Sequence, residues 1–132
     1  MKRQLVVTSL IIVALAGGPA RTQQPSCETW GGDSSLSGFL VSGAFPGPPE
    51  FTSIAGGDEP LSALLLYLDQ PICIDRSDAG DPMIAATELV QLACTKGQLA
   101  GRSEGESITL RGELYPAHTG YHRTPALLAC VD

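Results

Sequence analysis

The chain has 132 residues, with 8 basic and 14 acidic side chains and a formal net charge of −6. This length suits one small domain. Nucleic acids and anionic membrane surfaces attract clustered basic residues, and the few Lys and Arg residues here are scattered, so the composition speaks against both partners.

Residues 1–20 have the pattern of a secretory signal peptide. Two basic residues precede an apolar segment, residues 5–16, which is too short to span a bilayer comfortably. Gly-Pro-Ala at 18–20 resembles a cleavage site; cleavage a few residues earlier and an uncleaved anchor are the alternatives. Cleavage after residue 20 changes the formal net charge from −6 to −8, because it removes both basic residues. We therefore expect a periplasmic or secreted protein, with residues 21–132 forming one small β domain that has no membrane insertion.

Five short segments have the composition of β-strands. They are residues 36–41, 64–69, 88–94, 107–115 and 126–131. In the fourth, apolar and polar residues alternate with a period of two, which predicts one buried face. In the second, we expect Leu64, Leu66 and Leu68 to face inward. The third is ambiguous, because Asp81-Pro82 has the pattern of a helix start, but we favour a strand.

Gly38 and Gly112 lie inside two of these segments and predict bulges or sharp bends. Five bent strands in about a hundred residues favour an all-β fold, a small five-stranded OB-like barrel. A small β-sandwich is the alternative.

The cysteine framework follows from the same fold. The chain contains Cys27, Cys73, Cys94 and Cys130, and an even count in a small exported domain predicts two disulfides. A zinc site is disfavoured because the spacings are wide. In an OB-type barrel, the first two strands are antiparallel neighbours and the third and fifth are also neighbours. This register favours Cys27–Cys73 and Cys94–Cys130 among the three possible connectivities.

Four motifs in order make the chain similar to a known family. They are GPPEF at 47–51, GDEP at 57–60, LYLDQPIC at 66–73 and AHTGYHRTPALL at 117–128. Together they resemble the bacterial exported family called domain of unknown function 4431. The resemblance implies a small exported protein of Gram-negative bacteria, sometimes found beside a domain similar to LprI-type lysozyme inhibitors. It implies no catalytic residues. Many relatives carry histidines where this chain has Tyr121 and Arg123.

His118 and His122 are the only histidines, and they offer a candidate ligand pair. On an extended strand they would lie about 13 Å apart, too far for one metal ion unless the chain turns. Gly120 makes such a turn feasible. We favour a structural role in the loop before the last strand, and leave metal or ligand binding as alternatives.

Two loops are candidates for binding. Asp58 and Glu59 form a carboxylate pair between glycine and proline residues, which is more often a solvated turn than an acid–base site. Phe45 and Phe51 flank a Gly-Pro-Pro sequence on a long loop, which either packs across the barrel or binds a partner. The candidate binding residues are Phe45, Phe51, Asp58, His118, Tyr121, His122 and Arg123.

These patterns favour a non-catalytic binding or inhibitor-type module of the periplasm or cell envelope. We find no pattern for a catalytic site, a resident metal or a cofactor. The expected partner is a protein or an envelope ligand. A metal-binding protein that uses His118 and His122, and an enzyme with an unrecognised site, are the alternatives.

Overall fold

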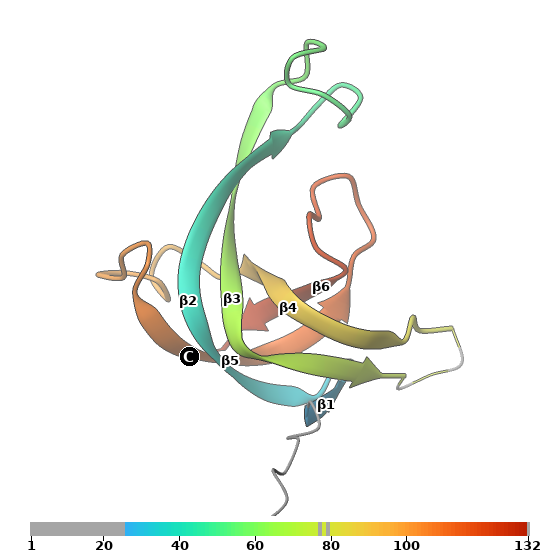
Figure 1. The fold of residues 1–132 in the computed structure, drawn as a ribbon, viewed down its shortest axis with the longest axis vertical. Coiled ribbons are helices and arrows are strands. Elements are labelled where there is room, and N and C mark those ends of the chain that lie inside the picture. Colours follow the sequence, from blue (N-terminus) through green and yellow to red (C-terminus); the bar gives the residue numbers. More distant parts are fainter. Residues whose placement is uncertain (1–25, 77, 79, 132) are drawn as a thin grey trace, which may run out of the picture.

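The computed structural model of the chain describes residues 26–76, 78 and 80–131. Within these ranges the protein is all-β and contains no helix (Figure 1). The predicted signal peptide lies outside the described residues. The strands are β1 (Ser26–Thr29), β2 (Asp33–Pro46), β3 (Pro60–Asp75), β4 (Ile84–Ala93), β5 (Ser107–Pro116) and β6 (Ala126–Cys130).

Strands β2 to β6 form a closed barrel. β2 pairs antiparallel with both β3 and β5, and β3 pairs antiparallel with β4. The ring is completed by β6, which is parallel to β4 and antiparallel to β5. Numbered in chain order, the five barrel strands follow the cyclic order 1-2-3-5-4, which is the OB arrangement. The predicted OB-like barrel is therefore confirmed over the sandwich alternative.

The five predicted strands all exist, although two are much longer than expected. β2 and β3 have 14 and 16 residues. Their paired ends form a hairpin that rises beyond the other strands (Figure 1). The helix alternative for the third segment is wrong, because Val90 and Leu92 of β4 alternate into the barrel core. β1, a short strand parallel to β3, was not predicted.

The core fills the barrel with aliphatic side chains from every barrel strand. Leu66, Ile74, Val90, Leu114 and Leu128 are completely inaccessible to solvent. Strand alternation explains this, because every second residue points inward.

The predicted inward face of β3 needs one correction. Leu66 and Leu68 are buried as expected, but Leu64 is 39% exposed and Leu65 is buried instead. Leu64 lies in the projecting hairpin, beyond Leu65, where the pairing with β4 begins. It therefore has no opposite barrel wall to pack against.

Gly38 and Gly112 allow neighbouring strands to approach closely. Each pairs with two strands at once, Gly38 with β3 and β5 and Gly112 with β2 and β6. A Cβ atom on Gly38 would lie 2.1 Å from the carbonyl oxygen of Tyr67, and one on Gly112 would lie 2.2 Å from that of Ala129. The register of β2 with β5 runs unbroken through both glycines, so neither is a bulge in that pairing. β2 curves strongly along its length, in agreement with the predicted bends (Figure 1).

Two disulfides join neighbouring strands, with the predicted connectivity. Cys27 and Cys73 occupy facing positions on β1 and β3. Cys94 follows β4 and is bonded to Cys130 at the end of β6. Two disulfides indicate a protein that resides outside the cytoplasm. The described residues include no helix suited to crossing a membrane.

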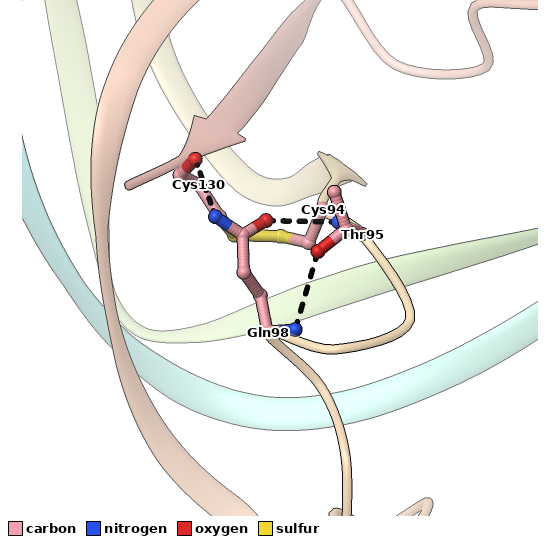
Figure 2. Close-up of a disulfide and its surroundings, with 4 residues drawn as sticks. All are labelled: Cys94, Thr95, Gln98 and Cys130. Carbon is pink, nitrogen blue, oxygen red and sulfur yellow. Dashed lines mark hydrogen bonds between the residues drawn. A yellow bond between two sulfur atoms is a disulfide. The ribbon is translucent and has the colours of Figure 1, made fainter. Parts of the chain in front are cut away.

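The second disulfide is reinforced by a side chain (Figure 2). The Gln98 amide nitrogen donates to the Cys130 carbonyl (3.0 Å), and its amide oxygen accepts from the Thr95 backbone N–H (2.8 Å). Gln98 therefore ties both ends of the disulfide to the turn that follows β4.

Candidate binding site

The loop between β2 and β3, residues 47–59, is closed by its own backbone. The Gly47 N–H donates to the Glu59 carbonyl (2.6 Å), and the Glu59 N–H donates to the Pro48 carbonyl (2.9 Å). Phe51 sits in the left-handed backbone region, with φ of 59°. This conformation is rare for a bulky residue, so the surrounding contacts must hold it.

Asp58 is the residue that organises this loop. Its carboxylate accepts backbone hydrogen bonds from Glu50 (2.9 Å), Thr52 (2.7 Å) and Ser53 (2.8 Å). These bonds, the one from Ser53 foremost, lower the pKa of Asp58 to about 2. The side chain is 7% exposed, so Asp58 is a clamp for the loop and not the solvated turn residue that the sequence suggested. Its acceptor atoms are engaged within the loop, which leaves little for a ligand.

Asp58→Asn is expected to destabilise the loop and to flatten the acid dependence of stability. The folded-state pKa is depressed, so the contribution of Asp58 is complete above its ordinary value of 3.8 and is lost as the pH falls towards about 2. Melting temperature measured from neutral pH down to about pH 2 tests this. The matched control is Glu59→Gln, which removes the neighbouring exposed carboxylate. Equal acid dependence in the wild type and Asp58→Asn would contradict the assignment.

The loop between β5 and β6, residues 117–125, is fixed to β4 by one glutamine. The Gln91 side-chain nitrogen donates to the Tyr121 carbonyl (3.2 Å), and its oxygen accepts from the Arg123 backbone N–H. The Gln91 backbone N–H in turn donates to the Thr124 hydroxyl (2.8 Å). Sequence reasoning missed Gln91, because a single polar residue in a strand gives no signal of a distant loop.

Beside this loop, a row of three side chains crosses the outside of the barrel. Leu65, Gln91 and Leu127 occupy one register across β3, β4 and β6. Leu65 and Leu127 are 4% and 1% exposed, yet they lie outside the main core cluster. Because the Gln91 side chain on this row bonds the loop, we infer that residues 117–125 shield the row from solvent.

The two histidines are brought together by a turn. The His122 N–H donates to the Thr119 carbonyl (3.1 Å), and the two imidazole centroids are 4.6 Å apart in an edge-to-face arrangement. Both rings also lie beside Tyr115, whose pKa is raised by burial.

Both Nδ1 atoms are used by the loop backbone. The His118 N–H donates to His122 Nδ1 (3.0 Å), and His118 Nδ1 lies 3.2 Å from the Pro116 carbonyl, which requires a proton on that nitrogen. Burial, and secondarily the charge of His118, lower the pKa of His122. In the neutral forms of both rings, this network makes His118 Nε2 an acceptor and the His122 Nε2–H a donor. The described residues hold no group of three or more metal-ligating side chains.

Arg123 joins the two loops. Its guanidinium lies over the rings of Phe45 (5.6 Å to the centroid) and Phe51 (5.7 Å), and donates to the Pro46 carbonyl (2.6 Å). No carboxylate in the described ranges forms an ion pair with it. Cation–π contacts between half-buried groups such as these contribute about 1 kcal/mol each. Phe51 also meets the Tyr121 ring edge-to-face at 5.0 Å.

The structure therefore brings the seven predicted residues to one face, which we call the loop face. It comprises residues 45–59 and 117–125. Within it, Tyr121 is 55% exposed and His118 is also exposed, whereas Phe45, Phe51, His122 and Arg123 are half-buried. The loop face therefore presents the Tyr121 ring and the imidazole nitrogens to solvent. The Arg123 guanidinium holds the two loops together beneath them.

The fold and the loop face together define a small, disulfide-linked barrel of the OB type. The loop between β2 and β3 and the loop between β5 and β6 meet on one side of this barrel. Residues 89–132 match the family model described as "Domain of unknown function (DUF4431)". The matched part of the chain includes β6 and the 117–125 loop, and it contains the motif at 117–128 that resembles this family. No curated protein and no solved structure matches the chain.

Proposed function

We propose that the protein is a non-catalytic binding module of the bacterial periplasm or cell envelope, and that it binds through the loop face. OB-type barrels commonly bind ligands with the loops that join strands 1–2 and 4–5. In this chain those connections are residues 47–59 and 117–125. Their direct contact through Arg123 is the observation that carries the proposal, because it makes one continuous surface out of two loops.

The exposed chemistry of the loop face suits a protein or a polar envelope ligand. Tyr121 supplies a large amphipathic side chain, a type that dominates binding energy in many interfaces. In their neutral forms, the imidazoles beside it supply one acceptor and one donor. The net charge of −6 disfavours nucleic acid as the ligand. The proposal assigns no catalytic residue and no cofactor.

Tyr121→Ala is expected to weaken capture of the partner by roughly tenfold or more, as loss of an aromatic anchor does. The purified wild type and variant serve as bait in bacterial envelope extract, followed by affinity measurement with the purified partner. Met83→Ala is the matched control, because Met83 is 63% exposed and lies before β4, outside the loop face. Melting temperatures verify that both variants fold. Equal affinity of the wild type and Tyr121→Ala would overturn the proposal.

Metal binding by His118 and His122 is the second candidate, because the turn brings the ring centroids to 4.6 Å; a metal ion on His122 Nδ1 would have to displace the His118 N–H that this atom accepts. Titration with Zn²⁺ or Cu²⁺ separates it from the first. A metal-binding function requires stoichiometric binding that the His118→Ala/His122→Ala double variant loses. Identical weak binding in both proteins would remove it.

A further inference from the structure

A second surface, distinct from the loop face, has an unusual charge pattern. β2, β3 and β4 carry carboxylates at Asp33, Asp69, Asp75 and Glu88, and they contain no Lys, Arg or His. Asp33 is paired with Arg111 of β5. Apart from Arg123, which lies over Phe45 at the far end of β2, the remaining charged side chains on this three-stranded wall are acidic, and a cationic partner complements them.

An apolar row crosses the same wall. Phe39 faces Tyr67 across β2 and β3, and Tyr67 faces Leu89 across β3 and β4. Phe39 and Tyr67 are 45% and 48% exposed. Side chains directly opposite on neighbouring strands lie close enough to form one surface, so two aromatic residues stand together in solvent.

A groove opens at the β4 end of this row. It has a volume of about 580 Å³ and is lined by Tyr67, Pro71, Ala86, Thr87, Glu88 and Leu89. Its lining is mainly apolar, with one aromatic ring and one carboxylate. The Tyr67 hydroxyl donates to Glu88 Oε2 (3.3 Å), which places the carboxylate beside the ring.

We propose that this groove receives a lysine or arginine side chain from a basic partner protein. The aliphatic stem of the incoming side chain packs on Pro71, Ala86 and Leu89. Long cationic side chains bind in this way because their stems are apolar and only their ends are charged. The charged end meets Glu88 and the face of Tyr67, which combines an ion pair with a cation–π contact.

The charge of the whole chain supports this occupant over others. An acidic ligand would be repelled by Glu88 and by the net charge of −6. A second copy of the chain carries the same acidic excess. A basic protein is attracted by the long-range field and then held by the groove.

An oligolysine peptide is a direct probe of the groove. Backbone amide chemical shifts of the ¹⁵N-labelled protein are followed during titration, with the lysine-acetylated peptide as the uncharged comparison. Thr87 and Leu89 are expected to shift with the first peptide and not with the second. Glu88→Gln is expected to weaken binding by roughly tenfold, because it removes the charge and keeps the shape.

Glu113→Gln is the matched control, since it removes an exposed carboxylate from β5. It should leave the affinity nearly unchanged. The proposal fails if Glu88→Gln and Glu113→Gln have equal effects, if the acetylated peptide binds as well, or if the shifts lie on the loop face. Concentration-dependent self-association that Tyr67→Ala abolishes would also overturn it, by making a second copy the occupant.

Discussion

Gly38→Ala and Gly112→Ala are each expected to lower the free energy of unfolding by about 3 kcal/mol. The added Cβ atom would lie only 2.1 Å or 2.2 Å from a backbone carbonyl oxygen of the neighbouring strand. A backbone atom cannot move aside as the end of a flexible side chain can, so the strands must separate. Urea denaturation measures the loss as a lower transition midpoint.

Gly80→Ala provides the control for these substitutions. Among the described residues other than Gly80 and its chain neighbours, no atom lies within 4 Å of the position that its Cβ would take. Its effect should stay within about 0.5 kcal/mol of zero, as for most surface substitutions. Transition midpoints for Gly38→Ala and Gly112→Ala that match the Gly80→Ala midpoint would show that the strands are farther apart than described.

Removal of the Cys94–Cys130 disulfide by double alanine substitution is expected to lower the free energy of unfolding by about 4 kcal/mol. The bond joins residues separated by 36 positions, and restricting such a loop in the unfolded chain accounts for this magnitude in the chain-entropy model. It also lies at the end of the parallel pairing of β4 with β6, which extends over only three residue pairs. We therefore expect amide hydrogen exchange to accelerate at β6.

The Cys27→Ala/Cys73→Ala variant shows whether faster exchange at β6 follows from lower overall stability or from loss of the Cys94–Cys130 bond itself. Its bond joins residues separated by 46 positions, so the same model gives a similar loss of stability. However, β1 pairs with β3 outside the ring of barrel strands. Exchange at β6 should then follow global unfolding alone. Faster exchange at β6 in both variants to the same degree would contradict a specific role for Cys94–Cys130.

Much of the fold was predictable because several signals in the sequence agree. Alternation in residues 107–115 and the glycines inside two strands favoured a barrel of bent strands. The barrel order then placed the cysteines next to each other in pairs, and this prediction is confirmed. The strands thus follow from periodicity that acts locally, and the disulfide pairing follows from the barrel order that the strands define.

The features that the sequence does not predict depend on contacts between distant parts of the chain. β1 has four residues, too few to show a period, and forms only because β3 offers it an edge. Where the hairpin leaves the barrel, Leu64 is exposed and Leu65 is buried, which is the reverse of the expectation.

The sequence predicts which residues belong to the loop face, but it does not predict the hydrogen bonds that hold the two loops in place. Six of the seven candidate residues lie in two loops, whereas Phe45, expected on a loop, lies near the end of β2; these segments do meet. The sequence did not reveal that Asp58 points into its own loop or that Gln91 holds the other loop in place. Both effects arise from hydrogen bonds to backbone groups, which leave no pattern of residue types.

The clamp at Asp58 also bears on the thermodynamics of binding. Loops that become ordered only on contact lose conformational entropy at that moment, and this loss weakens affinity. Residues 47–59 are already held by three backbone hydrogen bonds to a single carboxylate. A partner of the loop face would therefore meet a preorganised surface, and the backbone should change little between the free and bound states.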